Sequence, residues 1–218
     1  EYAKALRLLL GLPQTDFKGK TYLCCKTAKK EGSRVDNLLH HALSCGAEGH
    51  AGLMNKRHNA LCRILQRAFQ EVKIPYDAEV PVVDGRMDII AHADPCEWLI
   101  DVVVTNPMSD GALKKNPKNR KLWAAKDAEN VKFGKYKDLK ENDRMIIPFA
   151  IEATGGFGDS ADKLLKLLGR LHRVRCSGLK EVRNFRKLIV AKLSVCLMRY
   201  NVYMMDWFLG SEVWETWN

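Results

Sequence analysis

The chain has 218 residues and a formal net charge of +10, with 36 Lys and Arg against 26 Asp and Glu. This balance favours a polyanionic partner, and nucleic acid is the leading candidate. Seven cysteines, an odd number at uneven spacing, exclude the usual framework of a small secreted disulfide protein. No apolar run approaches the roughly 20 residues of a membrane span, and no secretory signal is recognisable. We therefore expect a soluble intracellular protein with one main domain.

The first 50 residues predict a short helix and then a segment rich in metal ligands. Tyr2 to Leu10 has an amphipathic helical pattern, and residues 1–20 as a whole are typical of a linker from an upstream region. Residues 21–50 then concentrate thiols and imidazoles, which tetrahedral Zn²⁺ prefers. Plain burial of the cysteines is the other interpretation. By type and spacing, the best zinc ligands are Cys24 or Cys25 with His41 and Cys45.

A helix is predicted over Asn55 to Val72. Its apolar residues recur at helical spacing and make one stripe: Leu61, Ile64, Leu65, Ala68, Phe69 and Val72. Arg57 and His58 fall in its first turn. For Arg57 two interpretations stay open, a solvated terminal turn and a contact with phosphate.

Two aspartates mark the strands that follow a first predicted strand at Ala78 to Val83. Asp88 begins Asp-Ile-Ile-Ala, and Asp101 lies within the apolar run from Trp98 to Val104. Antiparallel strands joined by the turn at 92–95 would bring both carboxylates to one end of a sheet. Mg²⁺ prefers such oxygens, and there it would acidify a water and neutralise charge on a phosphodiester. Each Asp alone also fits a turn or surface charge, but Asp101 is costly to bury unless paired or metal-bound.

A basic segment and a lysine-bearing helix come next. Residues 106–121 are rich in Asn, Pro, Gly and Lys and predict a mobile loop, which is either solvated or follows a DNA backbone. Trp123 to Leu139 reads as a helix. Lys132, Lys135 and Tyr136 share one of its faces, so they either point together at the acidic pair or are ordinary surface residues.

The remaining chain predicts a strand and two long helices. The strand covers Met145 to Ala153, and its Pro148 suits a sheet edge or a bulge. Gly155 to Gly158 has neither the glycine spacing nor the Lys-Ser/Thr of a nucleotide loop, so we interpret it as a strand-to-helix turn. The helices are expected at about Ser160 to Val174 and Gly178 to Phe208.

Several short motifs follow one another along this basic chain. They are His41-Ala42-Leu43-Ser44-Cys45, Arg57-His58-Asn59, Arg86-Met87-Asp88 with Asp101 on the next strand, Lys132-Phe133-Gly134-Lys135-Tyr136, and Pro148-Phe149 with Gly155-Gly156-Phe157-Gly158. In order and separation, over roughly residues 21 to 205, they resemble the C-terminal restriction-like endonuclease region of non-LTR retrotransposons. Each motif is weak alone, but their succession is fairly specific.

The resemblance implies an α/β fold of the PD-(D/E)xK nuclease type over residues 55–218, with a mixed central sheet flanked by helices. A zinc-knuckle-like segment at 21–54 would precede it and hold His41, Cys45 and Cys24 or Cys25. Asp88 and Asp101 would bind Mg²⁺ or Mn²⁺. Lys132 and Lys135 would supply the active-site lysine, with Tyr136 in support.

In that family the region follows a reverse transcriptase and nicks chromosomal DNA, so that the freed 3′ end primes reverse transcription. The resemblance therefore implies a nuclear location, with target DNA and the upstream reverse transcriptase as partners. RNA stays open as a further partner, and no membrane is expected. The resemblance places Arg57 and His58 near DNA or the active centre. The residues expected to bind DNA are Arg57, His58, Arg86, Lys114, Lys115, Lys118, Arg120 and Lys121.

Two other functions stay open. A non-catalytic DNA-binding module that positions an upstream reverse transcriptase would bind DNA in a salt-sensitive way without cutting it. A resolvase or repair nuclease of the same fold would share the chemistry and differ in its substrate.

Overall fold

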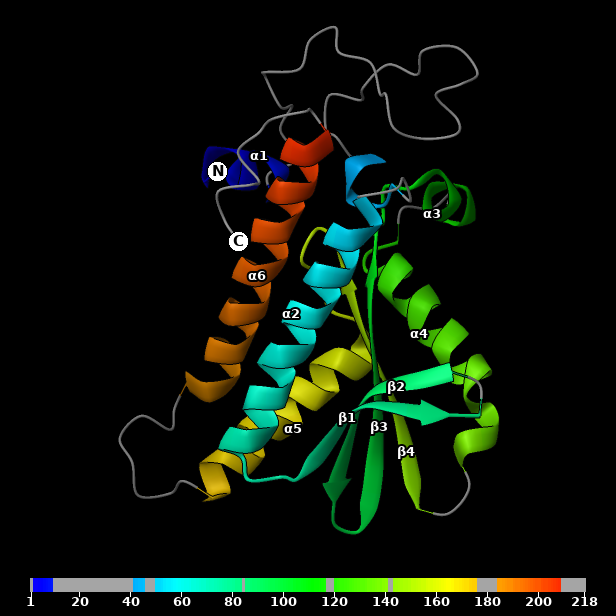
Figure 1. Cartoon of the computed structure of the whole chain (residues 1–218), viewed down its shortest axis with the longest axis vertical. Helices are drawn as coiled ribbons and strands as arrows, with labels where there is room; N and C mark the ends of the chain where they lie inside the picture. The colour runs from blue at the N-terminus through cyan, green and yellow to red at the C-terminus, as the bar shows by residue number, and fades with distance from the viewer. Residues whose placement is uncertain are drawn as a thin grey trace, which may run out of the picture.

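The computed structural model describes residues 2–9, 41–45, 50–83, 85–116, 120–140, 143–175 and 184–208. In this part of the chain a four-stranded sheet lies between two layers of helices (Figure 1). The strands are β1 (Tyr76–Val82), β2 (Gly85–Ala93), β3 (Cys96–Thr105) and β4 (Arg144–Glu152). The helices are α1 (Tyr2–Leu9), α2 (His50–Glu71), α3 (Asp110–Lys115), α4 (Trp123–Lys135), α5 (Asp159–Arg175) and α6 (Phe185–Phe208), with 3-10 turns η3 (His41–Leu43) and η4 (Lys137–Lys140). The expected mixed α/β class is confirmed.

The sheet has the order β1-β2-β3-β4 and mixes two kinds of pairing. β1 with β2 and β2 with β3 are antiparallel, whereas β3 and β4 are parallel and are connected through α3 and α4. The antiparallel β2–β3 pair was predicted from the turn at 92–95. Pro148 lies opposite Asp101 on β4, an outer strand of this sheet, where a residue without an N–H is tolerated.

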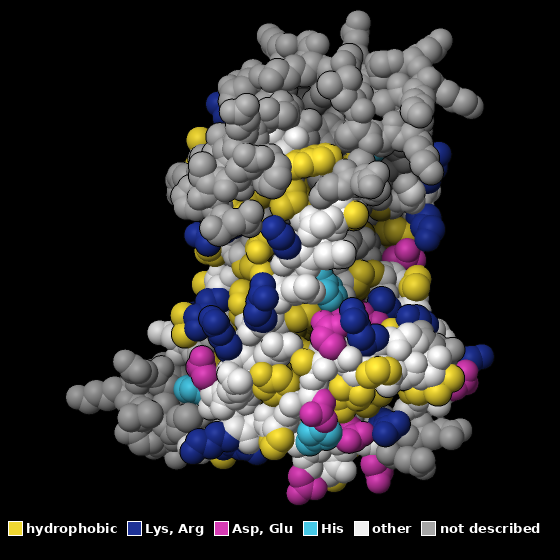
Figure 2. Space-filling model, in the orientation of Figure 1, with side chains coloured by type: hydrophobic (Ala, Val, Ile, Leu, Met, Phe, Trp, Pro, Cys, Tyr) yellow, Lys and Arg dark blue, Asp and Glu magenta, His cyan; other side chains and the backbone are white. Residues whose placement is uncertain are grey.

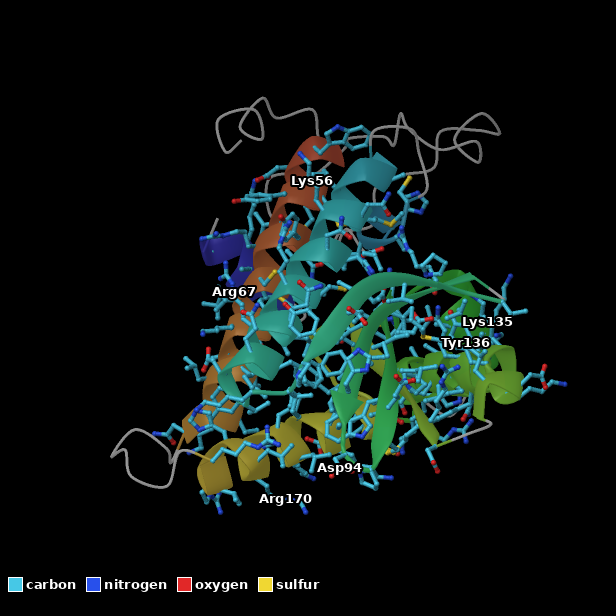
Figure 3. The ribbon with its side chains drawn as sticks, turned by 60° about the horizontal axis from the view of Figure 1, so that its bottom comes forward. Lys56, Arg67, Asp94, Lys135, Tyr136 and Arg170 are labelled. Atoms are coloured by element: carbon cyan, nitrogen blue, oxygen red, sulfur yellow. The ribbon has the colours of Figure 1, made fainter. Side chains whose placement is uncertain are left out.

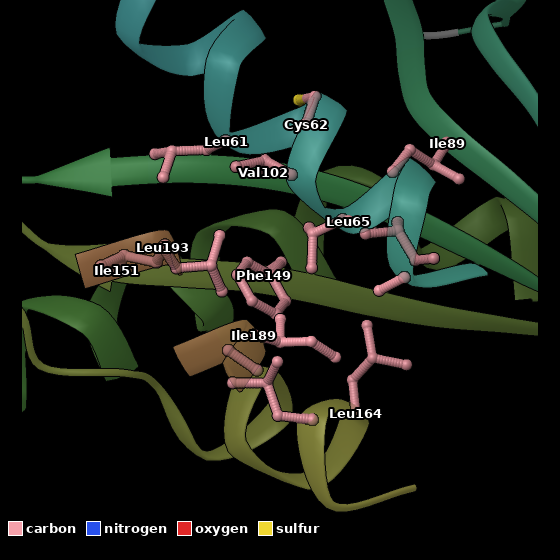
Figure 4. Close-up of a cluster of buried hydrophobic side chains, with 14 of the residues drawn as sticks. Leu61, Cys62, Leu65, Ile89, Val102, Phe149, Ile151, Leu164, Ile189 and Leu193 are labelled. Carbon is pink, nitrogen blue, oxygen red and sulfur yellow. The ribbon is translucent and has the colours of Figure 1, made fainter. Parts of the chain in front are cut away.

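The larger core lies on the face of the sheet covered by α2, α5 and α6 (Figures 1 and 4). The predicted stripe of α2 supplies it, since every member except the half-buried Ile64 is buried. Phe149 of β4 lies near its centre, beside Leu164 of α5 and Ile189 of α6. Each such side chain contributes roughly 1.5–3 kcal/mol on burial, so this layer fixes where α2 stands against the sheet.

The opposite face of the sheet carries a smaller apolar cluster beneath α4 and η4. Tyr136 lies at its centre with Met87 and Ile90 of β2, Leu99 of β3 and Ile146 of β4. The Tyr136 ring is only 1% exposed. A ring held on all sides in this way presents its hydroxyl in one direction.

The segment expected to be a mobile basic loop is partly helical. α3 begins after Ser109, whose hydroxyl accepts a hydrogen bond of 3.3 Å from the N–H of Ala112. Ser is a favoured N-cap because it satisfies a helix N–H that has no partner within the helix. The prediction of a loop throughout residues 106–121 was therefore wrong for Asp110–Lys115.

The N-terminal division also differs from the expected one. α2 begins at His50, so the boundary expected between residues 54 and 55 falls inside a helix. Leu43 of η3 belongs to the larger core. α1, which was predicted, packs against α6, where Lys4 pairs with Asp206. Residues on both sides of the expected boundary thus share one core.

α6 has the length and composition of a membrane-crossing helix between Phe185 and Trp207, which sequence inspection missed. It is the one such helix among the residues described. Several of its apolar side chains lie in the larger core, among them Phe185, Ile189, Leu193 and Leu197. A core helix passes the same test of length and hydropathy. Its predicted start near Gly178 lies outside the described residues.

Candidate active site

Asp88 and Asp101 lie on the neighbouring antiparallel strands β2 and β3. Ile89 lies opposite Ile100 at the end of the paired segment, and Asp88 and Asp101 are the next residues beyond that pair. The Asp88 carboxylate accepts a hydrogen bond of 2.6 Å at Oδ2 from the N–H of Val102. It therefore lies against the peptide link between Asp101 and Val102. Both side chains are buried, with 7% of Asp88 and 5% of Asp101 exposed.

Asp101 is paired from α4, as the helical spacing predicted. Lys132 Nζ lies 2.9 Å from Asp101 Oδ2, and the Tyr136 hydroxyl donates to the same oxygen at 2.6 Å. These contacts offset the cost of burying a carboxylate. Both contacts are made to the same oxygen of the carboxylate, Oδ2.

Lys135 is connected to Asp101 through Tyr136. Its Nζ donates to the Tyr136 hydroxyl at 3.0 Å and lies 4.7 Å from the centre of the ring, a cation–π distance (Figure 3). The β1–β2 hairpin passes close by at Gly85, where a Cβ would lie 3.1 Å from Lys135 Nζ. Lys132 thus contacts the acidic pair directly, and Lys135 contacts it through Tyr136.

His58 reaches the same place from α2. Its Nε2 lies 3.0 Å from Asp88 Oδ1. This hydrogen bond raises the pKa of His58, and the fields of Asp88, Glu79 and Asp101 act in the same direction while burial opposes them. The resemblance placed His58 near DNA or the active centre, and the structure places it beside the acidic pair.

Cys62 is a neighbour that sequence reasoning did not single out. Its Sγ lies 3.5 Å from His58 Nε2, one helical turn along α2. Burial strongly raises the pKa of this thiol, so it is protonated in the absence of a cation. The available signal was the four-residue spacing of His58 and Cys62, which puts both side chains on one face of a helix.

Arg57 is buried, and both interpretations left open for it were wrong. Its side chain donates from Nη1 to Asn201 Oδ1 at 2.8 Å and from Nη2 to the carbonyl of Leu43 at 3.4 Å. Burial lowers its pKa to about 10. With 4% of the residue exposed, Arg57 ties α2 to α6 and η3 rather than facing solvent or a phosphate.

The other residues expected near DNA lie at the surface. Arg86 is exposed and pairs with Glu79 at 2.7 Å, and Lys115 pairs with Asp127 at 3.3 Å. Lys114, Arg120 and Lys121 are exposed, and Lys118 lies outside the described residues. Exposed ion pairs of this kind contribute little to stability, so these side chains can be recruited by a polyanion.

A second basic surface on α2 was not predicted. Lys56, Arg63 and Arg67 are exposed and fall on one face of the helix, at intervals of seven and four residues. Figure 3 shows Lys56 and Arg67 along α2, and Figure 2 shows basic side chains on the face that includes this helix. The same helix carries His58 on a different face. We call these three residues the α2 ridge.

The predicted zinc ligands are described only in part. His41 begins η3 and Cys45 is buried just after it. Cys24 and Cys25 lie outside the described residues. A zinc knuckle therefore stays a prediction.

The glycine-rich segment is a strand-to-helix turn closed by an acidic side chain. Glu129 of α4 accepts hydrogen bonds at Oε1 from the N–H groups of Ser160 and Ala161, at 2.8 and 3.4 Å. Burial raises its pKa. A Cβ on Gly158 would lie 2.2 Å from Glu129 Oε1, so a larger residue would not fit without movement. A carboxylate already occupies the N-terminus of α5, the place where a phosphate would bind.

The site combines two buried carboxylates with a directly bound lysine, a phenol and an imidazole. Carboxylate oxygens can hold a hard divalent cation, and a lysine ammonium can offset charge on a phosphate. A comparison with known protein families finds no match to this chain, and a comparison with curated proteins finds none. Function is therefore inferred from the geometry.

Proposed function

We propose that this protein is a divalent-metal-dependent DNA endonuclease with a restriction-endonuclease-like fold. The observation that carries the proposal is that Asp88 accepts a hydrogen bond from the N–H of Val102, the residue after Asp101, while Lys132 contacts the Asp101 carboxylate. Carboxylates that can hold Mg²⁺ and a lysine that can offset phosphate charge suit phosphodiester cleavage. The net charge of +10 suits a nucleic-acid substrate.

The donor set fits Mg²⁺ or Mn²⁺, because both ligands are buried carboxylates that supply hard oxygens. The chemistry that such a cation would supply when bound is acidification of a water and neutralisation of charge on the scissile phosphate. Asp88 and Asp101 would hold it. Val102 orients Asp88 through its N–H, and Tyr136 orients Asp101 through its hydroxyl. Lys132, in contact with Asp101, would supply positive charge toward the phosphate.

The biological reaction that we propose is nicking of target DNA by a retrotransposon enzyme in the nucleus. Cleavage would leave a 3′-hydroxyl, because only that end can prime synthesis by an upstream reverse transcriptase. The α2 ridge and the exposed residues Lys114, Arg120 and Lys121 would contact the DNA backbone. Such contacts give affinity that falls steeply with salt.

One observation favours the non-catalytic alternative. In this structure Asp101 is paired with Lys132 and Asp88 with His58, so the carboxylates are partly neutralised without a cation. Carboxylates paired with a lysine and a histidine in this way are sufficient in a protein that only binds DNA. Arg86, in contrast, pairs with Glu79 and does not neutralise Asp88. The two functions differ in cleavage and share salt-sensitive binding.

A plasmid-nicking assay with Mg²⁺ tests the proposal. We expect Asp88→Ala and Asp101→Ala to lower the nicking rate by at least about a hundredfold, since each removes charge that holds the cation. Asp127→Asn, at an acid on the outer side of α4, is the matched control and should nick normally. Extension of the product by a polymerase checks for a 3′-hydroxyl.

Equal nicking by both Ala variants would exclude the catalytic assignment. Salt-sensitive binding with no metal-dependent cleavage by the parent protein would favour the DNA-binding module. Preference for a four-way junction over linear DNA would favour a resolvase.

A further inference from the structure

We propose that His58, Cys62 and Asp88 form a second kind of cation site, one that binds Zn²⁺ or a similar transition metal. We further infer that zinc bound there inhibits the nuclease by taking Asp88 from Mg²⁺. The inhibition rests on the proposed nuclease function, whereas the zinc site itself does not.

The ligand atoms already stand at distances that suit one ion. One atom from each of the three residues lies within 4.8 Å of the other two. Cys62 Sγ and His58 Nε2 are 3.5 Å apart. Tetrahedral bonds of about 2.3 Å to sulfur and about 2.0 Å to nitrogen separate the two ligand atoms by about 3.5 Å. His58 Nε2 and Asp88 Oδ1, at 3.0 Å, would open by a few tenths of an ångström.

The three ligands are held by rigid elements. His58 and Cys62 lie one turn apart on α2, and Asp88 is fixed on β2 by the N–H of Val102. Three protein ligands leave a fourth position for water, the arrangement of many zinc sites that are not purely structural. Glu79 and Asp101 act electrostatically on both His58 and Cys62, so the surroundings are negative and attract a cation.

The ligand types select the metal. A thiolate and an imidazole favour Zn²⁺ and Co²⁺, whereas Mg²⁺ requires oxygen ligands. On binding, the Cys62 thiol gives its proton to solvent and the thiolate binds the cation, and a protonated His58 gives up its Nε2 proton as well, so the site gains one metal and loses up to two protons. His58 binds as neutral imidazole through Nε2, the nitrogen that faces Cys62 and Asp88.

Asp88 cannot serve both cations fully. Its Oδ2 accepts the N–H of Val102, and its Oδ1, which lies 3.0 Å from His58 Nε2, is the oxygen that zinc would take. Zinc shared with His58 and Cys62 therefore draws that oxygen toward α2. Mg²⁺ would then be left with Asp101 as its single full ligand, and its binding would weaken.

Cobalt titration of the whole protein tests the zinc site without any nuclease assay. Cobalt bound to a thiolate gives a charge-transfer absorption band in the near ultraviolet. We expect wild type to bind one more equivalent of Co²⁺ than Cys62→Ala, even if Cys24, Cys25 or Cys45 also bind metal. Cys196→Ala, at a half-buried cysteine on α6, is the matched control and should titrate like wild type. His58→Gln provides a second variant that keeps the thiol and should also lose the equivalent.

Zinc inhibition of nicking in Mg²⁺ tests the regulatory part. The Zn²⁺ concentration that halves the nicking rate should rise about tenfold or more in Cys62→Ala, since loss of a ligand costs at least as much as loss of a supporting contact. The halving concentration is measured relative to each variant's own nicking rate in the absence of zinc. Equal cobalt stoichiometry in wild type, Cys62→Ala and His58→Gln would overturn the site. A cobalt difference without a shift in zinc inhibition would overturn the competition with Mg²⁺. If no protein nicks DNA, the cobalt result still decides the site separately.

Discussion

Tyr136 donates its hydroxyl hydrogen to Asp101 Oδ2 at 2.6 Å, from a ring that is almost wholly buried. The same hydroxyl accepts a hydrogen bond from Lys135, so the phenol stands between that lysine and the carboxylate. Lys132 needs no intermediary, because its Nζ reaches Asp101 directly. The two lysines are therefore not equivalent, although they lie one turn apart on α4.

We predict that Lys132→Met lowers the nicking rate far more than Lys135→Met does. Lys132 would supply charge at the scissile phosphate, and loss of such a group costs about a hundredfold or more. Lys135 acts through Tyr136, so its loss should cost closer to tenfold, by the general scale of supporting contacts. Single-turnover nicking at saturating protein measures both.

Tyr136→Phe tests whether Lys135 acts through the Tyr136 hydroxyl. It keeps the ring in its apolar cluster and removes only the hydroxyl, so the protein should stay folded and its rate should resemble that of Lys135→Met. Both changes interrupt the same series of contacts, from Lys135 through Tyr136 to Asp101. The nicking rate of the double variant should therefore be no lower than that of either single variant. Larger loss from Lys135→Met than from Lys132→Met would contradict this order.

We predict that Gly158→Ala lowers the free energy of unfolding by about 1–3 kcal/mol, the usual cost of overpacking. The added Cβ would meet Glu129 Oε1 at 2.2 Å and Glu129 Cδ at 2.6 Å. That contact would displace the carboxylate from the N-terminus of α5. Urea unfolding followed by circular dichroism measures the change.

The control for this glycine lies on the helix that carries Glu129. At Gly134 an added Cβ would meet no heavy atom within 4 Å, so Gly134→Ala should leave stability unchanged or raise it by up to about 1 kcal/mol. If Gly158→Ala were as stable as Gly134→Ala, Glu129 would not be closing the turn as described.

We predict that His92, beside the turn between β2 and β3, makes the free energy of unfolding depend on pH. Its Nε2 lies 2.9 Å from Asp77 and its Nδ1 lies 3.1 Å from Glu97, so one ring links β1, β2 and β3. The hydrogen bond with Asp77 raises the pKa of His92, burial opposes this rise, and Glu97 adds to it. A raised pKa means that folding favours the protonated ring. The stabilisation is therefore complete below the ordinary value of 6.5 and is lost as pH rises through the raised value.

We expect His92→Gln to lower the free energy of unfolding at about pH 5.5 and to change it less at about pH 8.5, on either side of the histidine range. Because the group is exposed, added salt should shrink the difference. Asp77→Asn should shrink it too. A gap between wild type and His92→Gln that grew with pH would mean that the ring is not held as the cation.

Much of the fold could be predicted because its elements follow local patterns. The stripe of α2 repeats at the helical period, and the strands holding Asp88 and Asp101 are short β-branched runs around a turn. Spacing also placed Lys132 and Tyr136 on one face of α4. Such patterns depend on residues a few positions apart, so sequence reasoning can see them. The capped helix α3 was missed because Asn, Gly and Pro around it mimic a loop.

By itself, the sequence determined most of the elements, their order and the chemistry that two acids, two lysines and a phenol can perform. Only the tertiary structure decided that Arg57 is a buried tie to Asn201, that Cys62 joins His58 beside Asp88, and that Lys132 contacts Asp101 while Lys135 does not. Each of these outcomes depends on side chains that are far apart along the chain and meet only when α2, α4 and α6 pack on the sheet. Which side chains are buried and which are paired depends on that packing, so the periodicity of the local sequence cannot predict it.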